Sequence, residues 1–163
     1  MTKSNQIADD HDVETVQRAV FRPRLEQNVW RVNVVLVEDD PADCELIVRA
    51  LKKNDDVGFV KAYESPETAL EALRDEQLRP TVILADVHMP RMDGFQFVDL
   101  VRRIPHVQEV PVVFLTTSSL ERDVEEARQS TACKYIVKPA SYGDLQDRLN
   151  DVVKQMVAGT RRK

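Results

Sequence analysis

The chain has 163 residues, of which 42% are hydrophobic and 31% are charged, a balance typical of a globular protein rather than a disordered one. Its formal net charge is -5 and no domain-sized stretch is strongly basic, so we expect no sequence-independent binding to nucleic acid. The apolar runs are short and no signal peptide begins the chain, so we expect a cytoplasmic protein that does not bind membranes.

Residues 1–30 do not share the pattern of the rest of the chain. An acidic run at residues 9–12 precedes Val13, Val16 and Val20, which fall at helical spacing. Adjacent residues of one segment rarely converge on a metal ion, so the run is interpreted as the solvated start of a helix. We therefore expect an N-terminal extension that is partly flexible or forms a short helix. Whether it packs on the main domain or on a second subunit stays open.

From residue 33 onward, short runs rich in β-branched residues alternate with stretches whose apolar residues recur at helical spacing. The expected strands comprise residues 34–37, 58–63, 82–85, 111–115 and 134–137. The helices that follow them carry apolar stripes formed by Cys44, Ile47, Val48 and Leu51; by Ala69, Leu70 and Leu73; by Phe97, Val101 and Ile104; by Leu120, Val124 and Ala127; and by Leu145, Leu149, Val152 and Met156. Apolar strands separated by helices indicate an α/β fold, with a parallel sheet covered by helices on both faces.

Polar side chains follow four of the expected strands. Glu38 and Asp39 come after the first strand and Asp86 after the third, while Thr116 and Lys138 follow the fourth and the fifth. The carboxyl ends of parallel strands form one edge of the sheet, where ligands bind. Crowded carboxylates repel one another, and a hard cation such as Mg²⁺ relieves this repulsion. A carboxylate can also attack phosphorus to form an aspartyl phosphate, whose charge a metal, a lysine and a hydroxyl stabilise.

Four segments together resemble the receiver domain of two-component response regulators. They are residues 36–40 (LVEDD), 85–94 (ADVHMPRMDG), 115–118 (LTTS) and 135–139 (YIVKP). The resemblance covers about residues 31–157, which we take as the receiver domain, followed by a short basic tail over residues 158–163. It implies a flavodoxin-like, doubly wound sheet of five parallel strands in the order 2-1-3-4-5.

The resemblance also implies roles for the residues at the strand ends. Asp86 would accept the phosphoryl group from a sensor histidine kinase or a histidine phosphotransfer protein. Mg²⁺ would be bound by Asp39, Asp86 and the backbone carbonyl of His88, while Glu38 would act through water. No other cofactor is expected. The protein would phosphorylate and dephosphorylate itself as a phosphoacceptor, and would not be a turnover enzyme.

The other implied roles concern the response to phosphorylation. Lys138 would pair with Asp86 and then with the phosphate, and Thr116 and Tyr135 would form the switch. Pro139 would follow a cis peptide bond. Because few residues follow the last expected helix, we expect a stand-alone, single-domain receiver that signals by binding a downstream protein. Homodimerisation through the fourth helix, fifth strand and fifth helix is a further expectation.

Two alternatives stay open. One is a receiver-like adaptor that signals without phosphate; the presence of Glu38, Asp39, Asp86, Thr116 and Lys138 together disfavours it. The other is a Mg²⁺-dependent phosphohydrolase with Asp86 as its nucleophile. This is the weaker alternative, because the chain has no insertion large enough for the cap that usually specifies the substrate.

Overall fold

The computed structural model describes residues 31–117, 121–129 and 134–160. The expectations for residues 1–30 and for the end of the basic tail lie outside these ranges, as does Leu120 of the predicted fourth helix. The described elements in chain order are β1 (Val32–Val37), α1 (Pro41–Lys52), β2 (Val57–Tyr63), α2 (Pro66–Leu73), β3 (Val82–Ala85), α3 (Gly94–Val101), β4 (Val112–Thr116), α4 (Glu121–Gln129), β5 (Lys134–Val137) and α5 (Tyr142–Thr160).

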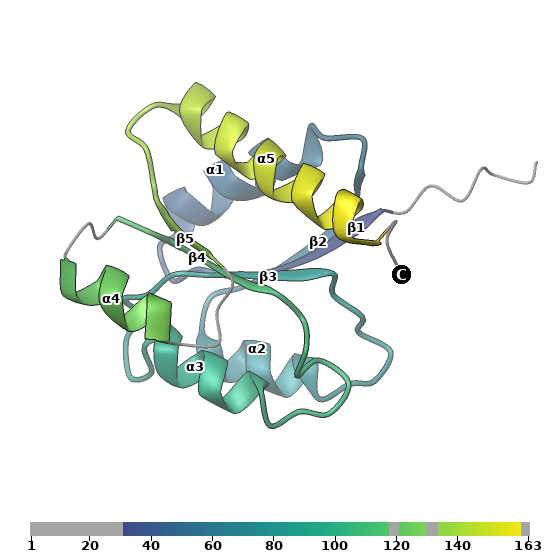
Figure 1. Ribbon diagram of the computed structural model, residues 1–163, viewed down its shortest axis with the longest axis vertical. Coiled ribbons are helices and arrows are strands. Elements are labelled where there is room, and N and C mark those ends of the chain that lie inside the picture. The colour runs from purple at the N-terminus through teal and green to yellow at the C-terminus, as the bar shows by residue number, and fades with distance from the viewer. Residues whose placement is uncertain (1–30, 118–120, 130–133, 161–163) are drawn as a thin grey trace, which may run out of the picture.

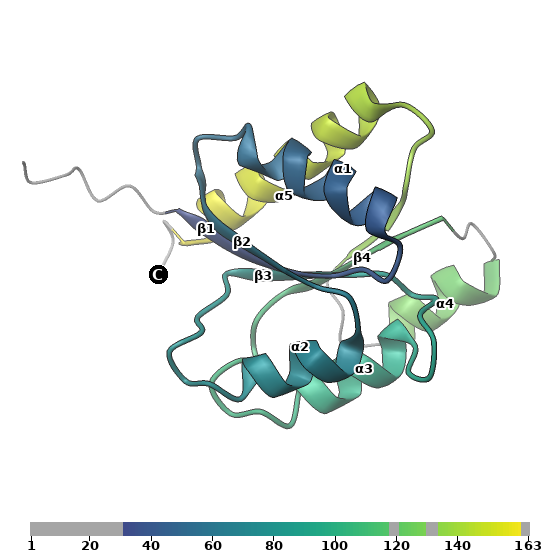
Figure 2. The same cartoon turned by 180° about the vertical axis from the view of Figure 1, so that it is seen from behind.

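The strands form one parallel sheet in the order β2-β1-β3-β4-β5, which confirms the predicted flavodoxin-like topology. Helices α1 and α5 cover one face of the sheet, and α2, α3 and α4 lie on the other (Figure 1). The reverse view shows the same division (Figure 2). Strand order changes direction between β1 and β3, and ligands bind beside such a point in open α/β sheets.

Side-chain alternation in the strands divides the core into two clusters, one on each face of the sheet. In β1, Val34 and Leu36 pack with residues of α1 and α5, whereas Val35 and Val37 pack with residues of α2 and α3. Both faces of the inner strands are therefore apolar, as expected for a parallel sheet between two helical layers. Polar side chains follow directly after the carboxyl ends of these apolar strands.

Local signals in the sequence explain where several helices begin. Asp40, Ser65 and Asp93 are N-caps whose side chains accept hydrogen bonds from the first turns of α1, α2 and α3. Helix α3 ends at Val101, earlier than the predicted stripe through Ile104, because Pro105 disfavours helical backbone at the residue before it. In contrast, α5 continues through Thr160, past residue 157. None of the helices among the described residues is long and apolar enough to cross a bilayer.

Candidate functional site

Three carboxylates converge where β1 and β3 end. The register pairs Val37 with Ala85, so the residues that follow these two strands lie side by side. One carboxylate oxygen from each of Glu38, Asp39 and Asp86 lies within 4.8 Å of the other two. Glu38 is only 1% exposed and Asp86 is also buried. Oxygen donors this close together match the preference of hard divalent cations such as Mg²⁺, so these residues fit a metal site.

The backbone around Asp86 fixes the orientation of its side chain. The Asp86 Oδ1 atom accepts hydrogen bonds from the backbone N–H groups of Val87 (2.6 Å) and His88 (3.4 Å), which leaves Oδ2 toward Lys138. The start of α3 comes very close to this turn. A Cβ atom on Gly94 would lie 2.4 Å from the Asp86 backbone oxygen. The glycine of the 85–94 motif therefore permits the close approach of α3 to β3.

Lys138 reaches the carboxylates from the end of β5. Its backbone N–H donates to the Thr116 carbonyl at 2.7 Å, which ties the segment after β5 to β4. Its Nζ atom donates to Glu38 Oε2 and to Asp43 Oδ2, both at 2.7 Å, and lies 3.5 Å from Asp86 Oδ2. Burial acts to lower the pKa of Lys138, but its hydrogen bonds to Asp43 and Glu38 and the charge of Asp86 outweigh this and raise the pKa. The lysine is therefore a permanent cation within the acidic cluster.

Glu38 is held from two sides. Its Oε1 atom accepts a hydrogen bond from the Asp40 backbone N–H at 3.2 Å, and its Oε2 atom accepts the bond from Lys138. Burial raises the pKa of Glu38 to about 7, although the hydrogen bond and the charge of Lys138 act in the opposite direction. A carboxyl group with this pKa changes charge near neutral pH.

Thr116 and Tyr135 lie on neighbouring strands beside the acidic cluster. Thr116 is the last residue of β4 and is fully buried. Tyr135 lies on β5, paired in register with Phe114, and its ring meets the Phe114 ring edge-on at a centroid distance of 6.4 Å. Thr116 is bound by the backbone of Lys138, and Tyr135 lies three residues before Lys138 along the chain.

The structure differs from the sequence-based expectations at one point beside Lys138. The peptide bond before Pro139 is trans, since no peptide bond among the described residues is cis. Lys138 reaches its carboxylate partners from this trans backbone. The expected ion pair with Asp86 is present at 3.5 Å, and Lys138 also makes two shorter contacts, with Glu38 and Asp43.

Sequence analysis missed two residues at this edge. Asp43 in the first turn of α1 binds Lys138, and Asp123 in α4 binds the ring of His88. A weak signal for Asp43 was its place one turn after the acidic run that follows β1. We find no sequence signal for Asp123, because its contact depends on how α4 packs. The expected role of His88 concerned its carbonyl, and the structure adds a partner for its side chain.

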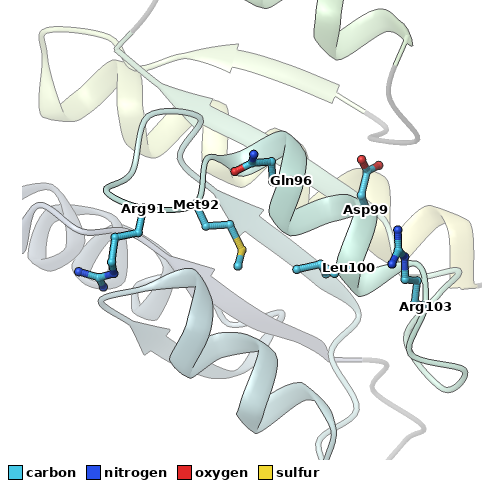
Figure 3. A pocket seen from close by; sticks show the side chains of 6 residues that line it. All are labelled: Arg91, Met92, Gln96, Asp99, Leu100 and Arg103. Atoms are coloured by element: carbon cyan, nitrogen blue, oxygen red, sulfur yellow. The ribbon is translucent and has the colours of Figure 1, made fainter.

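A separate surface pocket lies along α3 and the loop before it, away from the carboxylates. Figure 3 shows the side chains that line it: Arg91, Met92, Gln96, Asp99, Leu100 and Arg103. None of them belongs to the acidic cluster of Glu38, Asp39 and Asp86. The carboxylates to which the sequence assigned the chemistry therefore lie at the strand ends and do not line this pocket.

Comparisons with known proteins agree with this geometry. The family model for the response regulator receiver domain matches residues 34–150. The chain is 29% identical over 123 residues to the probable methanogenesis regulatory protein FilR2 of Methanothrix harundinacea, covering 73% of this chain and 79% of that protein. It is 28% identical over 138 residues to the signal transduction histidine-protein kinase BarA of Escherichia coli, covering 85% of this chain but only 14% of the kinase.

Two solved structures have the same fold. The phosphorylated cyanobacterial phytochrome response regulator RcpA is 26% identical with a TM-score of 0.67, covering 75% of this chain and 91% of that one. The Mn²⁺-bound form of the response regulator Rcp1 is 28% identical with a TM-score of 0.66, covering 74% and 91%.

Proposed function

The chain belongs to the family of response regulator receiver domains, whose model covers residues 34–150, and from this premise we propose that it is a phosphoacceptor of a two-component system. The observation that carries the proposal is the position of the Asp86 carboxylate, which belongs to the acidic cluster and lies 3.5 Å from the Lys138 ammonium. The donor is a phosphohistidine on a sensor histidine kinase or on a histidine phosphotransfer protein.

In the proposed reaction, a carboxylate oxygen of Asp86 forms a bond to phosphorus while the P–N bond of the donor phosphohistidine breaks. The electron pair of that bond stays on the imidazole nitrogen of the donor, which then takes up a proton. The product is an acyl phosphate on Asp86. Transfer of this kind depends on positioning and on stabilising the charge of the transferred group. The bonds from Val87 and His88 to Oδ1 hold the nucleophile in one orientation.

Asp39, Asp86 and the backbone carbonyl of His88 would hold Mg²⁺, with Glu38 acting through water. When bound, the ion offsets the negative charge of the carboxylates and of the phosphoryl group. The oxygen donors of Glu38, Asp39 and Asp86, grouped within 4.8 Å, support this assignment. The Mn²⁺ in the related Rcp1 structure is consistent with it.

Lys138 stabilises the transferred group through its charge, and Thr116 donates its hydroxyl hydrogen to a phosphoryl oxygen. Tyr135 follows Thr116 inward and thereby changes the surface formed by α4, β5 and α5. The phosphorylated state then binds a downstream protein or a second copy of the chain through this surface. Such a switch needs an element with two arrangements that phosphate contacts can bias. The receiver domain comprises residues 31–157, and the protein acts in the cytoplasm. It accepts a phosphoryl group and is not a turnover enzyme.

The test is the intact mass of the protein after incubation with phosphoramidate and Mg²⁺. Native protein should gain one phosphoryl adduct that requires Mg²⁺, and Asp86→Asn should gain none. Asp99→Asn, which removes an exposed carboxylate of α3, is the matched control and should behave as the native protein does. An unmodified native protein would contradict the proposal and favour a phosphate-independent adaptor.

A further inference from the structure

The ammonium of Lys138 is shared unequally among three carboxylates from three elements of the fold. Its Nζ atom lies 2.7 Å from Glu38 Oε2 and 2.7 Å from Asp43 Oδ2, but 3.5 Å from Asp86 Oδ2. An ammonium group has three N–H donors, and two of them are engaged in these short, charge-assisted bonds. The residue proposed as the phosphoacceptor is therefore the partner that the lysine contacts most weakly.

Asp43 differs from the other carboxylates in its origin and in its exposure. It lies in the first turn of α1, where its backbone N–H donates to the N-cap side chain of Asp40 at 2.9 Å. Ile47, Ala50 and Leu51 bury the inner face of this helix, so the position of Asp43 is set by the packing of α1. Its side chain is 34% exposed, whereas that of Glu38 is 1% exposed.

The contacts of Asp43 exclude two simpler roles for its side chain. The group of carboxylates able to hold one metal ion comprises Glu38, Asp39 and Asp86, and Asp43 does not belong to it. The N-cap of α1 is Asp40, so the carboxylate of Asp43 is not required to cap the helix. Among the described residues, the one side-chain partner that the structure shows for this carboxylate is Lys138.

We propose that Asp43 is a positioning residue that holds Lys138 away from Asp86 in the resting protein and competes with the phosphoryl group for the ammonium. This inference rests on the proposed phosphoacceptor function. Lys138 must weaken a short contact before it can approach a phosphoryl group on Asp86. Glu38 is buried and would be left without water, whereas the partly exposed Asp43 can be hydrated once released. The contact with Asp43 is therefore the one that breaks.

The competition predicts that Asp43 slows phosphorylation. With phosphoramidate at saturating Mg²⁺, Asp43→Asn should increase the rate of adduct formation about threefold to tenfold, because the lysine no longer has to leave a charged partner. Asp43→Glu restores the charge and should bring the rate back toward the native value. Asp144→Asn is the matched control, since Asp144 occupies the same position in the first turn of α5 and has no ion pair among the described residues. Its rate should equal that of the native protein.

A double-mutant cycle tests whether Asp43 acts through Lys138. In a Lys138→Ala background, Asp43→Asn should produce no further change in the rate. A rate for Asp43→Asn that equals or falls below the native rate would overturn the proposal, as would an equal acceleration with and without Lys138.

A crystal structure of the Asp43→Asn variant separates this inference from the proposed function. The Lys138 Nζ atom should move from 3.5 Å to hydrogen-bonding distance from Asp86 Oδ2. If native protein forms no adduct, the proposed function fails, yet this structure still decides whether Asp43 holds the lysine away. A lysine that keeps its native position in the variant would overturn the inference even if phosphorylation occurs.

Discussion

The Nε2 atom of His88 lies 2.8 Å from the Oδ2 atom of Asp123, so a residue two positions after Asp86 contacts helix α4 directly. The Asp123 side chain is only 3% exposed, while the His88 ring is 51% exposed. A buried carboxylate is costly unless it has polar or charged partners. The pair therefore joins the loop between β3 and α3 to the helix that forms part of the proposed switch surface.

Replacing His88 with Ala should loosen α4. The variant removes a partner of a buried carboxylate, so we expect a loss of about 1–2 kcal/mol in the free energy of unfolding. Amide hydrogens of α4 should exchange faster, while those of α1 should be unchanged. Hydrogen exchange followed by mass spectrometry measures both effects.

The control for this variant is Arg91→Ala, which breaks an exposed ion pair between the same loop and Glu67. It should leave exchange in α4 unaltered, because that ion pair is with α2. Equal exchange in α4 for His88→Ala and for native protein would show that the His88–Asp123 contact does not hold the helix.

Gly94→Ala should destabilise the protein and disturb Asp86. The new Cβ atom would meet the Asp86 backbone oxygen at 2.4 Å and the Val87 Cα atom at 3.0 Å, so the backbone beside the site must shift. We expect the free energy of unfolding, measured with urea, to fall by about 1–3 kcal/mol and phosphorylation to become slower. Gly143→Ala is the control, since the nearest neighbour of its new Cβ atom would be 3.9 Å away. This variant should have a free energy of unfolding about 0.5–1 kcal/mol higher than that of native protein. Similar results for both alanines would contradict the steric explanation.

The stability of the metal-free protein should fall between about pH 4.5 and pH 7. Burial raises the pKa of Glu38 from its ordinary value of 4.5 to about 7, so the folded state binds this proton more tightly than the unfolded state. The stabilisation is fully present below pH 4.5 and is lost as the pH rises through 7, amounting to about 3 kcal/mol. The raised pKa of Lys138 acts only above its ordinary value of 10.5, outside this window.

Urea unfolding at several pH values measures this effect. In Glu38→Gln the free energy of unfolding should depend less on pH in this range, because the variant has no proton to lose at this position. Glu45→Gln, at an exposed carboxylate of α1, should follow the native profile. The Glu38 explanation fails if the Glu38→Gln variant declines as steeply as native protein does.

The sequence pattern was sufficient to predict a parallel sheet and the polar residues at its strand ends, and the strand order came from the family resemblance. Its apolar runs are short and separate, and N-cap signals such as Ser65-Pro66 mark helix starts, so the elements are locally defined. Glu38, Asp39 and Asp86 come together because parallel strands β1 and β3 end at the same edge. Their proximity follows from topology, which the sequence pattern and the family resemblance supply.

The partners of Lys138 and His88 could not be predicted in the same way. Asp43 is 95 residues from Lys138 and Asp123 is 35 residues from His88. Each contact depends on where a helix rests on the sheet and on which rotamer a long side chain adopts. Spacing within a helix indicates which face is apolar, but it does not specify which polar side chain will meet another element.

The most direct test of the account is to identify the residue that carries the phosphoryl group. Native protein would be phosphorylated with phosphoramidate and Mg²⁺ and then treated with borohydride, which reduces an aspartyl phosphate to homoserine. Peptide mass spectrometry locates the change. The account predicts homoserine at Asp86 alone. Homoserine at Asp39 or Asp40, or a phosphoryl adduct on His88 that borohydride leaves intact, would contradict it.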